Sequence, residues 1–199
     1  ESLAHREKGG KDIDWTSDPE RTDETLGLLF VFCYAWSIGG NTTASGMEAF
    51  DEFCRNEFDE SVPSIPPTGT LYEMFVDVRH QTMDRWTSVV PSFEYVADSS
   101  YLSILVPTVD TVRYSFLLDA CLDVSKSVLF TGESGAGKTA IVQSLLARNA
   151  KTKNCVPVSV AFSAQTSSPQ TQAMIEGKLE KRRKTIFGAP PGKNMVLFV

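Results

Sequence analysis

The sequence predicts an α/β protein whose parallel-sheet core is incomplete and is preceded by a small helical subdomain and a short β-hairpin linker. Three observations support this class. Residues 132–139 fit the phosphate-binding pattern G-x-x-x-x-G-K-[ST], and strand-length apolar runs alternate with helical patterns from residue 127 onward. Two helical patterns separated by Gly39 and Gly40 come first. We expect three domains, at residues 1–60, 61–100 and 101–199.

Composition narrows the classes of partner. The chain has 199 residues, of which 42% are hydrophobic and 22% charged, as in ordinary globular proteins. Its formal net charge of -6 gives no general attraction to nucleic acid or to an anionic membrane, so we expect neither partner; a basic partner stays open. The longest apolar run, 26–38, is too short to cross a bilayer. Because the chain lacks an initiator methionine and closes in the apolar run 195–199, we expect it to be part of a longer polypeptide.

Cysteine and histidine usage predicts neither a disulfide framework nor a metal site. No C-x-x-C pair occurs, and we expect the four cysteines to be reduced core residues, with disulfides as the alternative. They are Cys33, Cys54, Cys121 and Cys155. His5 and His80 are isolated, which is typical of surface histidines.

The first domain is predicted to be an αα-hairpin. Residues 1–21 are polar and lead into a helix at 22–38 that we expect to be buried on most sides and to end at Gly39. A second helix follows, with Ser45 and Glu48 as a capping box and a polar face that includes Asp51. The aromatic residues of the two helices fit either a helix-helix core or a binding surface.

The linker begins with a proline-rich stretch at 61–69. Alternation over 72–78 predicts a half-buried strand, and we expect a return strand near 85–90. Residues 91–100 are polar, and 101–106 form another short apolar run. A helix is then predicted from about residue 106 to 122, with Thr108 either as a plain cap or as part of a loop beside an adenine pocket.

The third domain is predicted to alternate strands and helices. We expect strands at 127–131, 155–162 and 195–199, and helices at 138–149 and 169–182, the second one capped by Ser168. A basic run closes that second helix, where cations would complement the helix dipole; contact with phosphate or with a neighbouring subunit is the alternative. The run consists of Lys178, Lys181, Arg182, Arg183 and Lys184.

The pattern at 132–139 has the chemistry of a phosphate cradle. Gly132, Gly135 and Gly137 let backbone N–H groups wrap a multiply anionic chain. Lys138 would reach the β- and γ-phosphates, and the Thr139 hydroxyl would coordinate Mg²⁺. A glycine-rich turn without a ligand is the alternative. In ATPases that carry this phosphate-binding pattern, a neighbouring strand ends in acidic residues that hold Mg²⁺ and position the attacking water. We expect these residues after Val199, so we assign no catalytic residue within 1–199.

With these motifs in hand, the whole chain resembles a dynein heavy chain at the junction of the second and third AAA+ modules of the motor ring. The similarity lies in residues 30–40 with 50–53, in 69–77, in 104–114 and in 132–139. Residues 163–172 and 177–183 are more similar to axonemal dyneins than to cytoplasmic ones. Another AAA+ remodelling ATPase and a cytoplasmic dynein are the alternatives.

The resemblance implies an ATP-driven microtubule motor of cilia and flagella, located in the axoneme within the cytoplasmic cytoskeleton. It implies a P-loop site for ATP or ADP with Mg²⁺, regulatory rather than the main hydrolytic site, so that residues 1–199 alone would not be competent for hydrolysis. The implied partners are microtubules through other parts of the chain, neighbouring AAA+ modules, and dynein intermediate and light chains. The implied nucleotide-binding residues are Val106, Pro107, Thr108, Gly132, Glu133, Ser134, Gly135, Ala136, Gly137, Lys138, Thr139 and Ala140.

Overall fold

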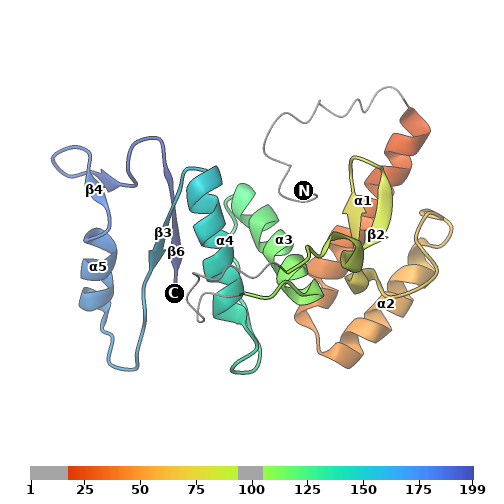
Figure 1. The fold of residues 1–199 in the computed structure, drawn as a ribbon, viewed down its shortest axis with the longest axis horizontal. Helices are drawn as coiled ribbons and strands as arrows, with labels where there is room; N and C mark the ends of the chain where they lie inside the picture. The colour runs from red at the N-terminus through yellow and green to blue at the C-terminus, as the bar shows by residue number, and fades with distance from the viewer. Residues whose placement is uncertain (1–17, 94–104) are drawn as a thin grey trace. The chain divides into compact units, whose positions relative to one another are not determined.

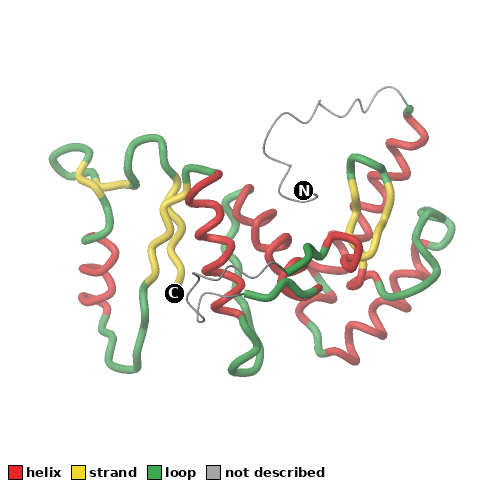
Figure 2. The backbone as a smooth tube through the Cα atoms, in the orientation of Figure 1, coloured by secondary structure: helices red, strands yellow, loops and turns green. Residues whose placement is uncertain are grey.

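The computed structural model describes residues 18–93 and 105–199, which fall into two compact units (Figures 1 and 2). The first unit holds the described residues up to 93 together with 106–113, and the second holds residue 105 and residues 114–199. Residues 1–17 and 94–104, and the loop and apolar run predicted there, lie outside the described part.

The first unit begins with two helices joined by a tight turn. Helix α1 (Pro19–Ser37) starts at Asp18, whose carboxylate accepts a hydrogen bond from the Arg21 N–H at 3.1 Å. A short 3-10 turn, η2 (Gly39–Asn41), ends it where the glycine pair predicts. Helix α2 (Ala44–Phe58) is capped by Thr43, whose hydroxyl accepts from the Gly46 N–H at 3.3 Å. The predicted cap at Ser45 is wrong because the extended residue before the helix is Thr43.

Helix α1 is buried on one side only, so the prediction of burial on most sides is wrong. The buried stripe repeats at helical spacing through Leu28, Val31, Phe32 and Ala35. Phe30 is 57% exposed and belongs to an aromatic cluster with the second helix, in which neighbouring ring centroids lie 5.5 to 6.0 Å apart. The cluster consists of Phe30, Tyr34, Phe50, Phe53 and Phe58.

The β-hairpin packs against α1 in the same unit. Strand β1 (Met74–Asp77) follows the turn η3 (Leu71–Glu73) and pairs antiparallel with β2 (Thr82–Arg85), which leads into η4 (Trp86–Val89). The hairpin is confirmed, although the return strand comes earlier than predicted. β1 is buried on both faces rather than half-buried, because Trp86 stacks on Phe75 with ring centroids 4.8 Å apart while α1 covers the hairpin.

The hairpin turn carries an ion pair between Asp77 and His80, whose Oδ2 and Nδ1 atoms are 2.7 Å apart. Burial acts to raise the pKa of Asp77, but hydrogen bonds from His80 and Arg79 outweigh it and lower that pKa. The hydrogen bond to Asp77 raises the pKa of His80. The His80 side chain is 77% exposed, so His80 is a surface histidine, as its isolation in the sequence predicts.

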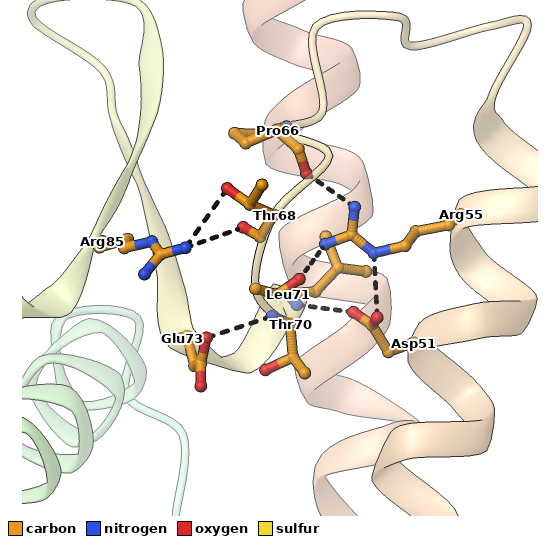
Figure 3. A network of polar contacts seen from close by, with 9 residues as sticks. Asp51, Arg55, Pro66, Thr68, Thr70, Leu71, Glu73 and Arg85 are labelled. Atoms are coloured by element: carbon orange, nitrogen blue, oxygen red, sulfur yellow. Dashed lines mark hydrogen bonds and ion pairs between the residues drawn. The ribbon is translucent and has the colours of Figure 1, made fainter.

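A polar network joins α2 to the loop before the hairpin (Figure 3). Asp51 is 8% exposed and accepts hydrogen bonds from the Leu71 N–H at 2.6 Å and from Arg55 Nε at 2.9 Å. Arg55 also donates to the carbonyl oxygens of Pro66 and Gly69, each at 2.7 Å. The predicted placement of Asp51 on an exposed polar face is wrong, since its carboxylate organises residues 66–71.

The second unit contains the parallel sheet. Strands β3 (Cys155–Ser159) and β6 (Asn194–Phe198) pair in parallel, with Cys155 opposite Asn194 and Ser159 opposite Phe198. Helix α4 (Lys138–Thr152) packs against β3, and α5 (Ser168–Glu176) lies on the other side of the two strands in Figure 1. Helix α3 (Val109–Asp123) precedes α4, and the division between the units falls within it. The predicted α/β class with a parallel sheet is confirmed.

Several sequence predictions in this unit are wrong. Residues 127–131 form no strand, and Leu129 is 86% exposed, because neither strand of the described sheet pairs with this segment. Helix α5 ends at Glu176 rather than near residue 182, and its cap is Ser167 rather than Ser168. The basic run therefore does not close a helix; most of it lies in a hairpin made by β4 (Glu180–Lys181) and β5 (Phe187–Gly188).

All four cysteines are free, as predicted, but only two lie in the core. Cys54 and Cys155 are buried, whereas Cys33 is exposed. Burial, with a contribution from Asp51, raises the pKa of Cys54 to about 11. That thiol stays protonated and behaves as a small apolar residue.

Candidate nucleotide-binding site

The segment between residue 131 and helix α4 forms an open loop built on glycine conformations. Gly132, Gly135 and Gly137 have φ angles of 149°, 84° and 82°, in the region that L side chains rarely adopt. A Cβ atom placed on Gly135 or Gly137 would meet no other atom within 4 Å. The loop residues 131–137 are exposed. The glycines therefore serve backbone shape and leave free space in front of the chain.

Lys138 lies at the mouth of this loop. Its side chain folds back so that Nζ donates hydrogen bonds to the carbonyl oxygens of Gly132 at 2.9 Å and Glu133 at 2.6 Å. The ammonium is thus held beside the glycine cradle by neutral dipoles. An anion entering the cradle would offer this cation a stronger, charge-assisted partner.

The beginning of α4 adds N–H groups that no side chain caps. Gly137 is the N-cap residue in the left-handed conformation, and the first backbone bond of the helix runs from the Ile141 N–H to the Gly137 carbonyl oxygen at 3.0 Å. The N–H groups of Lys138, Thr139 and Ala140 precede that bond and are free for an external acceptor. The first turn carries no acidic residue, so the positive end of the helix dipole is not neutralised.

The remaining loop residues lie where the pattern places them. Glu133, Ser134 and Ala136 are exposed, and a weak turn forms from the Ala136 N–H to the Glu133 carbonyl oxygen at 3.4 Å. The Thr139 side chain is exposed and follows Lys138 directly. The structure thus places all the sequence-predicted residues from 132 to 140 in one loop and the first turn of α4, with Lys138 Nζ folded back onto the loop.

Helix α4 is held in place by an apolar core under the loop. Leu118, Val142, Leu145 and Leu146 are buried together, and Phe130 and Phe198 pack against them. A cavity of about 700 Å³ lies between residues 125–130 and β6 and reaches Lys138 and Thr139 at its rim. Since most of its walls are Leu, Val and Phe side chains, the cavity is a gap beside the sheet rather than a phosphate pocket.

Sequence reasoning missed a group of hydrogen bonds and ion pairs between α3 and the C-terminal end of α4. Asn149 is 3% exposed and donates to Asp119 at 2.8 Å, while Lys153 Nζ lies 2.9 Å from Asp119 and 2.8 Å from Asp123. Burial acts to lower the pKa of Lys153, but the hydrogen bonds to both carboxylates outweigh it and raise that pKa. The signal in the sequence is Asn149 itself, a polar residue in helical register with Val142 and Leu145 on the apolar face of α4.

The predicted adenine-side segment belongs to the first unit, whereas the loop belongs to the second. Val106 is 52% exposed, and Pro107 is coil. Thr108 caps α3 by accepting from the Thr111 N–H at 3.2 Å, while its own N–H donates to the Thr111 hydroxyl at 2.7 Å. The cap is confirmed, and the role of residues 106–108 beside an adenine stays a prediction.

Neither a metal cluster nor a membrane helix is found in the described parts of the chain. Among residues 18–93 and 105–199, no three His, Cys, Asp or Glu side chains gather where they could hold a metal ion. The assignment of Mg²⁺ to Thr139 stays a prediction. No helix within the same ranges has the length and apolarity to cross a membrane.

The comparisons with known proteins agree with these features. A family model described as P-loop containing dynein motor region matches residues 93–199, and one described as dynein heavy chain AAA lid domain matches residues 4–88. The lid model thus matches the predicted helical domain and hairpin, and the motor-region model matches the part that contains the phosphate-binding pattern.

Among curated relatives, human dynein axonemal heavy chain 6 is 43% identical over 192 residues, which cover 96% of this chain and 5% of the relative. The dynein-1-beta heavy chain of the flagellar inner arm I1 complex of Chlamydomonas reinhardtii is 41% identical over 173 residues, covering 86% and 4% respectively. Human dynein axonemal heavy chain 2 is 34% identical over 184 residues, covering 92% and 4%. This chain therefore spans about a twentieth of the length of these relatives. The chain belongs to the family of P-loop-containing dynein motor regions.

Proposed function

We propose that this chain is a segment of the motor of an axonemal dynein heavy chain and that residues 132–140 bind ATP or ADP with Mg²⁺. Membership of the dynein motor-region family supports the motor, and the names of the relatives, which are axonemal or flagellar, support the axoneme of a cilium or flagellum. The same membership favours dynein over an unrelated AAA+ remodelling ATPase. The relatives' names favour an axonemal dynein over a cytoplasmic one.

The residues of the loop have distinct proposed roles. The free N–H groups around Gly135 and at the start of α4 would hold the phosphate oxygens, and Lys138 would leave the two carbonyl oxygens for the β- and γ-phosphates. The Thr139 hydroxyl would be one ligand of the metal ion, which when bound neutralises phosphate charge. Residues 106–108 would contact the adenine.

We further propose that this site is regulatory. Strand β6 (Asn194–Phe198) carries no carboxylate, so we assign no catalytic acid to the described sheet and place those groups elsewhere in the heavy chain. ATP hydrolysis would then be a property of the full-length heavy chain, and residues 1–199 alone would turn over ATP poorly. Microtubules, reached through other parts of the heavy chain, neighbouring AAA+ modules, and intermediate and light chains are the proposed partners.

The observation that carries the nucleotide site is the Lys138 ammonium held beside an uncapped glycine cradle. We expect Lys138→Ala in the full-length motor to weaken nucleotide binding at this site by about tenfold or more, because a charge-assisted contact to phosphate is lost. Binding of a fluorescent ATP analogue measures the loss, provided that the phosphate-binding loops elsewhere in the motor are blocked by substitution.

Lys151→Ala is the matched control, since Lys151 is exposed in the last turn of the same helix and far along it from the loop. Electron microscopy of both variants should show an intact ring. An unchanged affinity in Lys138→Ala, or an equal loss in both variants, would overturn the assignment.

A further inference from the structure

The hairpin formed by β4 (Glu180–Lys181) and β5 (Phe187–Gly188) has no part in the nucleotide site. The two strands pair over two residue pairs, and the turn between them spans residues 182–186. All residues from 180 to 187 are exposed. The Arg182 guanidinium donates to the Ala189 carbonyl oxygen, which anchors one side of the turn. The hairpin thus presents a short, accessible loop.

The turn contains a run of positive charges, although the chain as a whole is acidic. Arg182, Arg183 and Lys184 come directly before Thr185, and Ile186, which is 52% exposed, follows it. Residues 178–193 contain six cations and one acid, in a chain whose formal net charge is -6. Within the described ranges, none of these cations forms an ion pair. Apart from the contact of Arg182 with a backbone carbonyl oxygen, the basic run therefore has no acidic partner in the part of the chain that the structure describes.

The Thr185 hydroxyl makes no hydrogen bond to the described residues, unlike the hydroxyls of two other exposed or half-buried threonines of the same unit. The hydroxyl of Thr152 donates to the Arg148 carbonyl oxygen at 3.0 Å, and that of Thr171 donates to the Ser167 carbonyl oxygen at 3.1 Å. Both of these threonines lie in helices. Thr185 lies in the hairpin turn and makes no hydrogen bond through its hydroxyl to any residue that the structure describes.

We propose that Thr185 is a phosphorylation site for a serine/threonine protein kinase with an acidic substrate groove. Such a groove selects substrates by charge pairing, and arginines two and three residues before the acceptor with an apolar residue after it match that chemistry. In the reaction the Thr185 oxygen forms a bond to the γ-phosphorus of ATP. The bond from that phosphorus to the β,γ-bridging oxygen breaks, ADP leaves, and the hydroxyl proton goes to the catalytic base of the kinase.

The small size of the hairpin makes the site accessible to such an enzyme. A two-stranded hairpin is marginally stable by itself, so opening its two residue pairs exposes 180–187 as an extended peptide at low free-energy cost. The added phosphate brings a charge of about -1.5 to -2 into the middle of the basic run. It would pair with the neighbouring guanidinium groups and remove about a third of the charge excess of the hairpin.

The test uses the full-length heavy chain and the catalytic subunit of cyclic-AMP-dependent protein kinase, a probe that requires arginine at these two positions. We expect labelled phosphate from ATP to enter Thr185, as located by mass spectrometry. Thr185→Val should abolish incorporation in the peptide that contains residue 185, and Thr185→Ser should restore it. Arg183→Ala should lower the initial rate by about tenfold or more.

Lys178→Ala is the matched control, because it removes the same charge from the segment without changing the two positions before the acceptor; its rate should stay near that of the unmodified sequence. Thr152 should remain unlabelled throughout. A peptide of residues 176–192 serves as a second substrate. If the peptide is labelled and the heavy chain is not, Thr185 is covered in the protein and the proposal is wrong. It is equally wrong if Arg183→Ala and Lys178→Ala lower the rate alike.

Discussion

Gly137 serves two purposes at once. Its φ angle of 82° ends the loop in the left-handed region, and it is also the N-cap of α4 that leaves the first N–H groups uncapped. A serine or aspartate at this position would cap the helix but would occupy the N–H groups that we assign to phosphate. Glycine has no side chain to occupy those N–H groups and therefore leaves them available to an anion.

We expect Gly137→Ala to weaken nucleotide binding by about tenfold, because the left-handed conformation costs a non-glycine residue about 1 to 2 kcal/mol and the loop relaxes away from the required shape. Equilibrium binding of a fluorescent nucleotide to the motor measures the effect.

Gly192→Ala is the control for backbone strain alone. Gly192 has a φ angle of 73°, and a Cβ on it would likewise meet nothing within 4 Å, yet it lies in the turn before β6 and outside the loop. Both variants should lose similar stability, and only Gly137→Ala should lose nucleotide affinity. Equal affinities in the two variants would show that the shape of the loop does not matter for binding.

At the scale of elements, the periodicity of apolar residues predicts those helices and helix ends that depend on local interactions. Helix α4 begins at Lys138 as predicted, since its apolar stripe and the glycine before it are both encoded locally. Asp51 shows the limit of such reasoning. Its spacing on α2 is that of a polar face, but the loop at residues 66–71 folds over it and turns an ordinary carboxylate into a buried acceptor. That contact spans 20 residues, beyond the reach of any local pattern.

We expect Asp51→Ala to destabilise the first unit by about 2 to 4 kcal/mol, because it leaves the Leu71 N–H and the Arg55 guanidinium without their shared acceptor. Hydrogen exchange followed by mass spectrometry should show lost protection of the Leu71 amide and of the peptide around residues 66–73.

Glu52→Ala is the comparison, since Glu52 is the exposed neighbour on the same helix. It should change stability by less than about 0.5 kcal/mol. If Asp51→Ala leaves the Leu71 amide as protected as before, the polar network in Figure 3 does not hold the loop at residues 66–71 in place.

At the scale of the whole molecule, the segment 127–131 has the composition of a strand but has no strand to pair with in the described sheet. Its apolar, β-branched residues predict a buried strand, but a strand needs a neighbour with free backbone groups. In the described sheet β3 and β6 pair with each other, and the gap beside β6 is the cavity of about 700 Å³. Under the proposal that this chain is a segment of a longer heavy chain, the partner strand would come from elsewhere in that heavy chain.

We therefore expect Leu129, although 86% exposed here, to be buried in the full-length heavy chain. Leu129→Asp should lower the stability of the motor by about 2 kcal/mol or more, the value of burying a leucine side chain. Thermal unfolding of the purified motor measures this loss.

Val124→Asp provides the reference, because Val124 is also apolar and 65% exposed but follows the end of α3. Its effect should stay within about 0.5 kcal/mol. A Leu129→Asp motor as stable as the Val124→Asp one would mean that residues 127–131 stay outside the sheet.

The sequence by itself determined the glycine-rich loop, the start of the helix behind it and, to within one residue, the strand observed at residues 194–198. The loop and the helix start depend on neighbours within a few positions, and the strand is marked by its local apolar run. The sequence also determined the dynein resemblance, which the family models confirm. Only the tertiary structure decided that Asp51 is buried, that Asn149 and Asp119 lock α3 to α4, and that the basic run forms an exposed hairpin. The first two features rest on contacts between residues 20 and 30 positions apart, and the hairpin forms because α5 ends at Glu176 and leaves residues 180–188 free to pair.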